Sequence, residues 1–256
     1  MRAQRQLSPV DLYHIIARGT GRQNIFEDDA DRKMLLKLCA DALRDNEIEL
    51  YAWCLMSNHV HLVVHAPMPR LSAFMKALCG QYARYFNKKA GRSGHLFQER
   101  FRSEPICDEQ YLLTAVRYVH NNPAKAGLCP AARYPWSSYS EYASSPALCS
   151  TDTVLEIIGG AAEFARFQSN NTESNGCIDI DESNRAAVLD DDQASVIARE
   201  LLGHDTFSKL KELNRDERDA ALIALGHAGF STRQVERLTG ISKSVVARAW
   251  SNAQSE

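Results

Sequence analysis

The sequence predicts an α+β protein, with a ferredoxin-like split β-α-β core followed by a separate all-α helix-turn-helix domain. Two observations support this fold class. Segments with strand-like and helix-like hydrophobic spacing follow one another in the order β-α-β-β-α-β-α, which predicts an antiparallel sheet with helices on one face. Near the C-terminus, two short helical patterns flank a Thr-Gly-Ile turn. We therefore expect a core domain over residues 1–150, an acidic and partly flexible linker over residues 151–192, and a helical domain over residues 193–256.

The core elements follow from side-chain periodicity and from the residues that interrupt it. Alternating or continuous apolar residues predict strands, and apolar residues three and four apart predict helices. Gly19 and Gly21 end the first strand, and Asp108 is a good N-cap for the last helix of the core. The expected strands are residues 12–19, 49–55, 59–66 and 101–107, and the expected helices are residues 31–46, 72–89 and 108–121.

The composition indicates a globular protein of the cytoplasm. The seven cysteines are scattered, odd in number and without a C-x-x-C pair, which argues against a disulfide framework or a zinc ribbon. No apolar stretch reaches the length of a membrane span, and residues 1–10 lack the apolar core of a secretory signal. We therefore expect reduced thiols, a cytoplasmic location and no membrane partner.

The charge is unevenly distributed along the chain. The net charge is −2, but residues 1–144 carry +5 and residues 145–256 carry −7. Between Arg70 and Arg102 there are eight basic residues and one acidic residue, Glu99. A local basic stripe in a nearly neutral protein favours a groove for a polyanion, although a solvated helix face has the same composition.

Two histidines and a tyrosine form the most informative pattern in the core. His59 and His61 are two residues apart in an expected strand, so both imidazoles project from the same face. Tyr118 and Asn122 are four residues apart in an expected helix and share a face of that helix. Where this helix packs on the strand, the four side chains can converge. Such a set permits metal-assisted attack of the tyrosine on a phosphodiester.

A divalent metal fits this set of side chains. His59 and His61 supply neutral nitrogens, Asn122 supplies a carbonyl oxygen, and a phosphate and water can complete the coordination. Mixed nitrogen and oxygen ligands with open positions favour Mg²⁺ or Mn²⁺ as the working ion, although Zn²⁺ or Ni²⁺ can also bind. Each residue also has a simpler explanation: the histidines as a solvated sheet face, Tyr118 as a packing residue, and Asn122 before Pro123 as the end of the helix.

The helical patterns near the C-terminus predict a second nucleic-acid contact. Each half of the pattern begins with a serine that can cap a helix, and the spacing matches a helix-turn-helix. The second helix can present its first residues to the major groove of duplex DNA. A plain helical hairpin that contacts protein, or only packs, remains the alternative. The candidate DNA contacts are Ser242, Lys243, Ser244 and Arg248.

The same residues resemble a known family. His59-Val60-His61 resembles the HUH motif (histidine, hydrophobic residue, histidine) of the single-tyrosine transposases. The surrounding sequence resembles the REP-associated tyrosine transposases, and the C-terminal pattern resembles the duplex-binding domain of the replication initiator DnaA. The matching segments run in unbroken order over about residues 10–143: Ala17–Gly19 with Arg22-Gln23, Trp53–His61, Gly94–Phe101, Tyr118–Pro123 with Ala126-Gly127, and Trp136–Tyr139.

The resemblance implies a role for each of the central residues. It makes His59 and His61 metal ligands and Tyr118 the nucleophile, and it places the polar residue that completes the metal site on Asn122. It further implies a ferredoxin-like catalytic core and strand cleavage that leaves a 5′-phosphotyrosine and a free 3′-hydroxyl. The implied partner is single-stranded or hairpin DNA, with duplex DNA as a possible second partner of the C-terminal domain. The family includes both monomers and homodimers.

We therefore interpret the chain as a metal-dependent, single-tyrosine DNA nickase and strand transferase of the transposase type. Two alternatives stay open: a DNA-binding regulator that kept the fold but does not cut, and a metal-dependent nuclease that uses water while Tyr118 is structural. A covalent adduct between protein and DNA separates the three. The expected phosphate contacts in the core are Arg18, Arg22, Lys88, Lys89, Arg92, Arg100 and Arg102.

Overall fold

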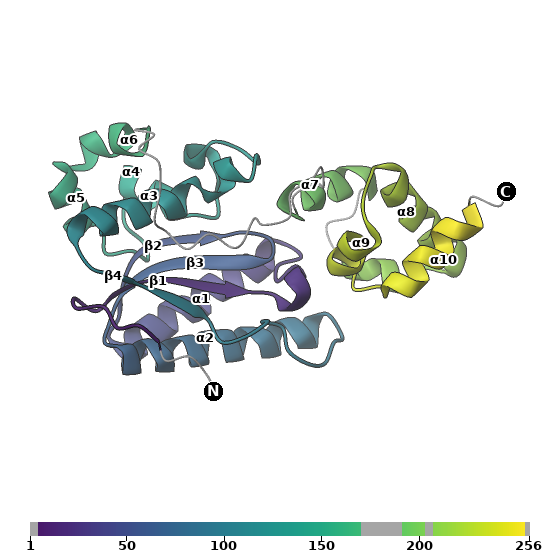
Figure 1. The fold of residues 1–256 in the computed structure, drawn as a ribbon, viewed down its shortest axis with the longest axis horizontal. Helices are drawn as coiled ribbons and strands as arrows, with labels where there is room; N and C mark the ends of the chain where they lie inside the picture. The colour runs from purple at the N-terminus through teal and green to yellow at the C-terminus, as the bar shows by residue number, and fades with distance from the viewer. Residues whose placement is uncertain (1–4, 170–190, 203–206, 254–256) are drawn as a thin grey trace.

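The computed structural model describes residues 5–169, 191–202 and 207–253. Its first group of elements is an antiparallel sheet covered by helices on both faces, and its second group is a helical unit near the C-terminus (Figure 1). Within those three ranges, no helix has the length and the apolar character that crossing a membrane requires.

The sheet has four strands in the order β2-β3-β1-β4, and every neighbouring pair is antiparallel. The central strand β1 pairs with β3 on one side and with β4 on the other. This topology confirms the predicted split β-α-β core. The strands are β1 (Leu12–Arg18), β2 (Glu49–Leu55), β3 (His59–His65) and β4 (Arg102–Ile106).

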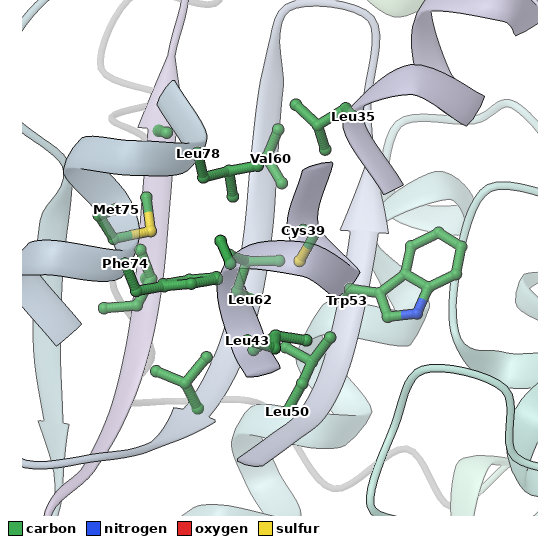
Figure 2. Close-up of a cluster of buried hydrophobic side chains, with 14 of the residues drawn as sticks. Leu35, Cys39, Leu43, Leu50, Trp53, Val60, Leu62, Phe74, Met75 and Leu78 are labelled. Carbon is green, nitrogen blue, oxygen red and sulfur yellow. The ribbon is translucent and has the colours of Figure 1, made fainter. Parts of the chain in front are cut away.

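Helices α1 (Asp29–Asn46) and α2 (Met68–Lys89) cover one face of the sheet, as expected for the two helices of this unit. Asp28 caps α1 through a capping box with Asp31. α2 begins four residues before its expected start because a proline suits the first turn of a helix. Figure 2 shows the core between the helices and the strands, with Leu35, Cys39 and Leu43 from α1, Phe74, Met75 and Leu78 from α2, and Leu50, Trp53, Val60 and Leu62 from the sheet.

Helix α3 (Glu109–Lys125) covers the opposite face of the sheet (Figure 1). Helices therefore lie on both faces and not on one face as predicted, because the apolar side of α3 is buried against the second face. Asp108 caps α3 as predicted, because its side chain accepts a hydrogen bond from the backbone N–H of Tyr111. The helix does not end at Asn122, however. It continues through Pro123 to Lys125, although proline removes one backbone donor from the helix. The extension adds a further turn beyond the candidate site residues.

The segment predicted to begin the linker is folded and belongs to the core. Three short helices follow α3, namely α4 (Tyr139–Ala143), α5 (Asp152–Ile158) and α6 (Ala161–Ser169), after a 3-10 turn at Ala131–Arg133. Val154 of α5 and Phe164 of α6 are buried in the same apolar cluster as the inner face of α3. The linker prediction is therefore wrong for residues 151–169, and residues 170–190 lie outside the described residues.

The helical unit has its own apolar core. It contains α7 (Asp191–Leu202), a 3-10 segment (Phe207–Lys211), α8 (Arg215–His227), α9 (Thr232–Thr239) and α10 (Lys243–Ala253). Ser231 caps α9 in a capping box with Gln234, and Gly240 ends α9 with a positive φ of 66°. Val235, Leu238, Ile241 and Val246 are buried in this core, and Trp250 is partly buried beside them.

We expect Phe164→Ala to destabilise the core domain strongly. The Phe164 ring is buried, stacks on Tyr142 with ring centroids 4.8 Å apart, and touches His120 and Tyr139. Removing a buried phenylalanine side chain costs about 3–5 kcal/mol. Urea unfolding measures the loss. Glu163→Ala on the exposed face of the same helix is the matched control and should have little effect, so equal effects of the two variants would restore the linker interpretation.

A second prediction concerns the packing of the C-terminal unit. A Cβ atom on Gly226 would lie 2.8 Å from Trp250 Cε2, and the Trp250 indole N–H donates to the Leu222 carbonyl at 2.7 Å. Gly226→Ala should therefore lower the stability of this unit by about 1–3 kcal/mol. Gly80→Ala in α2 is the control. Its Cβ atom would meet only the Arg84 side chain at 3.7 Å, so it should raise the melting temperature slightly. Unchanged melting with Gly226→Ala would contradict this packing of α8 against α10.

Candidate functional site

The two histidines of the HUH pattern project from the face of the sheet that α3 covers. In the register of the sheet, His59 lies opposite Arg18 and His61 lies opposite Ile16. The alternate residues of β3, Val60 and Leu62, face the core under α1 and α2. Both imidazoles therefore lie on the same face of the sheet, as their two-residue spacing predicts. Their ring centroids are 4.8 Å apart.

Helix α3 brings Tyr118 against this pair. The Tyr118 ring centroid lies 5.7 Å from that of His61, with the rings edge to face, and only 3% of the residue is exposed. Lys125, two helical turns further along α3, places its ammonium nitrogen 4.1 Å from the Tyr118 ring centroid. The packing of α3 on β3 thus joins the predicted nucleophile to the predicted metal ligands.

Asn122 lies one helical turn after Tyr118 and is 9% exposed. Its side-chain nitrogen donates a hydrogen bond to the Tyr118 backbone carbonyl at 2.9 Å. This bond engages the amide nitrogen, so the amide oxygen is the atom that a metal would use. Asn122 therefore holds its position in a continuing helix and does not terminate it.

Burial keeps both histidines neutral, which is the form that binds a metal. Desolvation lowers the pKa of His59 to about 3, with a further contribution from the positive charge of Arg18. Desolvation also lowers the pKa of His61 well below its usual value, assisted by His59, His14 and nearby cations. Neutral imidazole offers one nitrogen lone pair for coordination.

Hydrogen bonds determine which nitrogen of each ring is available. The Asn58 side-chain oxygen lies 2.6 Å from His59 Nδ1, and because an amide oxygen can only accept, Nδ1 donates and Nε2 keeps its lone pair. His61 Nδ1 lies 2.9 Å from His14 Nε2. His61 Nε2 is buried and has no hydrogen-bond partner among the residues that the structure describes. A buried ring nitrogen without a partner is costly, and a cation bound to its lone pair would satisfy it, so the site fits a metal ion.

The donor set is also consistent with a metal that keeps open positions. Among residues 5–169, 191–202 and 207–253, no group of three or more His, Cys, Asp and Glu side chains forms a closed metal cage. Two imidazoles and the Asn122 amide oxygen would leave coordination positions for water and for a phosphate oxygen. Open positions are typical of catalytic sites, whereas structural sites are closed.

Four of the seven predicted phosphate contacts lie together. Arg18, Arg22, Arg100 and Arg102 line one pocket of about 360 Å³. Ile16, Gln98 and Glu99 line the same pocket. Since Arg18 is the register partner of His59, and Arg102 that of Ile16, the pocket adjoins the histidine pair on the same face of the sheet. Four guanidinium groups around one pocket suit an anionic ligand.

The other three predicted contacts lie near the end of α2 and outside the pocket. Lys89 forms ion pairs with Asp28 at 2.7 Å and with the buried Asp31 at 2.6 Å. Arg92 donates a hydrogen bond to the Gln23 side chain. Lys88 is exposed in the last turn of α2. The structure therefore ties Lys89 and Arg92 to other side chains and does not bring these three residues to the histidine pair.

Sequence reasoning missed two residues beside the site. His14 of β1 is buried and its ring lies beside that of His61, with centroids 5.2 Å apart. Its proximity depends on the pairing of β1 with β3, which no local pattern reveals. Lys125 follows Tyr118 by seven residues, a spacing that returns to the same helix face. The expectation that the helix stops before Pro123 concealed it.

The four predicted contacts of the helix-turn-helix lie on the surface of α10. Lys243, Ser244 and Arg248 are exposed on this helix, opposite the buried Val246 and Ala249, and Ser242, which directly precedes the helix, is also exposed. The Ser242 and Ser244 hydroxyls are 3.1 Å apart. The predicted contacts are thus accessible, and DNA binding by this unit stays a prediction.

Comparison with known proteins finds one family similar to the core of the chain. Residues 11–122 match the family model described as "Transposase IS200 like". These residues include the histidine pair, Tyr118 and Asn122, and they end within α3. The match agrees with the resemblance stated from the motifs, so residues 11–122 are similar to IS200-like transposases.

Two solved structures are similar to parts of the chain. One is a REP-associated tyrosine transposase bound to a REP hairpin, with 19% sequence identity, coverage of 55% of this chain and 84% of that chain, and a TM-score of 0.45. The other is described as a transposase from Deinococcus radiodurans R1, with 23% identity, coverage of 47% of this chain and 97% of that chain, and a TM-score of 0.32. No curated protein matches the sequence.

Proposed function

We propose that this protein is a metal-dependent, single-tyrosine DNA nickase and strand transferase that acts on single-stranded or hairpin DNA, as REP-associated tyrosine transposases do. The observation that carries the proposal is the contact of Tyr118 with a buried histidine pair in which His61 Nε2 has no hydrogen-bond partner among the described residues. The family match over residues 11–122 supports the same chemistry.

The arginine pocket supplies the binding step. Guanidinium groups bind phosphate oxygens in pairs and with fixed geometry, so the pocket can hold the backbone of a nucleic-acid strand. Because Arg18 lies opposite His59 in the sheet, a phosphate held there lies next to the histidine pair. The pocket therefore positions the phosphodiester for attack by Tyr118.

Tyr118 carries out the covalent step. Its hydroxyl oxygen loses a proton and attacks the phosphorus, and the bond between phosphorus and the 3′ oxygen breaks. The 3′ oxygen leaves and takes a proton to become a 3′-hydroxyl, while the 5′ phosphate stays on Tyr118 as a phosphotyrosine. The ester bond is exchanged and not hydrolysed, so a 3′-hydroxyl can reverse the step and rejoin a strand without ATP.

His59 Nε2, His61 Nε2 and the Asn122 amide oxygen would hold the metal. A bound Mg²⁺ or Mn²⁺ supplies Lewis-acid polarisation of the phosphoryl oxygen. The protein itself supplies the neutral state of both imidazoles through burial, and it fixes the orientation of His59 through Asn58 and that of Asn122 through the Tyr118 carbonyl.

The C-terminal unit would add a contact to duplex DNA. Its exposed residues Lys243 and Arg248 lie at the start and in the middle of α10, which is the second helix of the motif. The first residues of such a helix reach base edges in the major groove. We infer that this unit holds the protein near duplex DNA while the core acts on a single strand.

The first functional prediction concerns the covalent intermediate. Hairpin oligonucleotides copied from the DNA beside this protein's own gene, incubated with the protein and Mn²⁺, should give an adduct that survives denaturation. Tyr118→Phe should give none, because the attacking oxygen is gone. Tyr85→Phe is the matched control and should keep the adduct, since its hydroxyl binds Asp31 away from the site. His61→Ala should lower adduct formation by orders of magnitude and affect DNA binding much less.

Each alternative outcome has a distinct meaning. An undiminished adduct with Tyr118→Phe would show that another residue is the nucleophile. Cut DNA without any adduct would indicate a nuclease that uses water. Binding without cutting, with Mg²⁺ or Mn²⁺ present, would indicate a regulator that kept the fold.

The second functional prediction concerns the arginine pocket. An Arg100→Gln/Arg102→Gln variant should weaken binding of a single-stranded oligonucleotide and flatten its salt dependence, by about 0.7 in slope for each phosphate that is no longer neutralised. Fluorescence anisotropy across a salt series measures both quantities. Lys88→Gln/Lys89→Gln changes the charge equally and is the control. A flatter slope in the control, together with an unchanged slope in the arginine variant, would place the strand along α2 and contradict the pocket.

A further inference from the structure

We propose that Glu104 and His14 determine which nitrogen of His61 is protonated, and that they thereby direct the lone pair of His61 Nε2 towards the metal position. This inference rests on the proposed function. Three side chains form a connected row, called here the Glu104 relay: Glu104, His14 and His61. Tyr111 of α3 contacts its outer end. The Tyr111 hydroxyl donates to Glu104 Oε1, His14 Nδ1 lies 3.4 Å from Glu104 Oε2, and His14 Nε2 lies 2.9 Å from His61 Nδ1.

The sheet builds this relay from three neighbouring strands. Glu104 of β4 and His14 of β1 are direct partners across the sheet, and His61 of β3 is the partner of Ile16, two residues along from His14. The three side chains therefore lie on the face that α3 covers. The planes of the His14 and His61 rings are nearly parallel, with 15° between them, and both residues are almost completely buried.

The chemistry of the end group fixes the direction of every hydrogen bond. An ionised carboxylate can only accept, so His14 Nδ1 carries a hydrogen and donates to Glu104. In a neutral imidazole the other nitrogen then has a lone pair, so His14 Nε2 accepts. His61 Nδ1 must therefore carry the hydrogen, which leaves His61 Nε2 with a bare lone pair. That atom is the buried nitrogen for which the described part of the chain provides no hydrogen-bond partner.

The opposite direction is physically unfavourable. If His14 carried two hydrogens, its Nε2 would donate to His61 Nδ1, and the hydrogen of His61 would lie on Nε2. A buried N–H group with no acceptor would result, and such groups are costly. The row is consistent with a carboxylate at one end and a cation at the other. The carboxylate accepts the hydrogen bond from His14 Nδ1, and the cation would bind the lone pair of His61 Nε2.

The relay gives the two candidate ligands different supporting partners. His59 is oriented by the neutral amide of Asn58, whereas His61 is backed by a second imidazole and a carboxylate. A carboxylate behind a ligating histidine fixes its tautomer and raises its basicity as a ligand. Glu104 and His14 are thus positioning residues that act through His61.

The first test measures the tautomer of His61 without any metal. Long-range ¹H–¹⁵N NMR of the full-length, metal-free protein distinguishes a hydrogen on Nδ1 from one on Nε2. The wild type should show His61 protonated on Nδ1. Glu104→Gln should lose that preference, because a glutamine amide can donate to His14 and reverse the row. Tyr111→Phe is the matched control: it removes a neighbour of Glu104 but keeps the carboxylate, so the Nδ1 tautomer should persist.

The second test measures Mn²⁺ affinity by electron paramagnetic resonance. Glu104→Gln should weaken Mn²⁺ binding by about 10- to 100-fold, as loss of a supporting carboxylate does at other metal sites, whereas Tyr111→Phe should stay close to the wild type. Circular dichroism shows whether each variant is folded. If Glu104→Gln does not fold, His14→Phe replaces it. It fills the ring space but removes the acceptor for His61 Nδ1, so it should lose the tautomer preference and the affinity together.

The outcomes separate this inference from the proposed function. A wild-type His61 protonated on Nε2 would overturn the relay, as would a Glu104→Gln variant that keeps both the tautomer and the Mn²⁺ affinity. If the wild type has the expected tautomer but binds no Mn²⁺ at millimolar concentration, the relay stands and the metal-dependent function fails.

Discussion

The structure depends on the register of the central strand β1 between β3 and β4. A shift of one residue would move every side chain of β1 to the other face of the sheet. Burial on both faces prevents this, because Tyr13 and Ile15 pack under α1 and α2 while His14 and Ile16 are buried beneath α3. The same register sets Arg18 opposite His59 and His14 opposite Glu104. The packing of the apolar side chains of β1 under α1 and α2 thus fixes which of its side chains lie on the face that α3 covers.

Helix α3 imposes the second constraint, and the short helices behind it hold it in place. His120 of α3 is buried, where Gln168 donates to its Nδ1 at 2.7 Å and its Nε2 donates to the Ser138 hydroxyl at 2.8 Å. The Arg117 side chain donates to the Phe167 backbone carbonyl. Tyr118 lies between these two anchored residues, so α6 contributes to the position of the nucleophile although none of its residues reaches the site.

The order of the core elements, the caps at Asp108 and Ser231 and the shared face of the two histidines could be predicted from the sequence alone. Each depends on interactions within a few residues, such as a capping hydrogen bond or the two-residue period of a strand. The motifs around His59 and Tyr118 also predicted the similarity to IS200-like transposases that residues 11–122 have. The acidic composition of residues 151–169 was misleading, because it reports the exposed faces of α5 and α6 and not the buried Phe164.

The tertiary structure alone decided which distant residues share the site. His14, Glu104 and Arg102 lie on strands that are far apart in the chain, and they meet the histidine pair only through strand pairing. It also separated two kinds of basic residue, since Arg18 lines the pocket whereas Lys89 binds the buried Asp31. Charge and local periodicity cannot make this distinction. They depend only on the residue type and its neighbours in sequence, whereas the ion pairs of a basic side chain depend on which residues folding brings next to it.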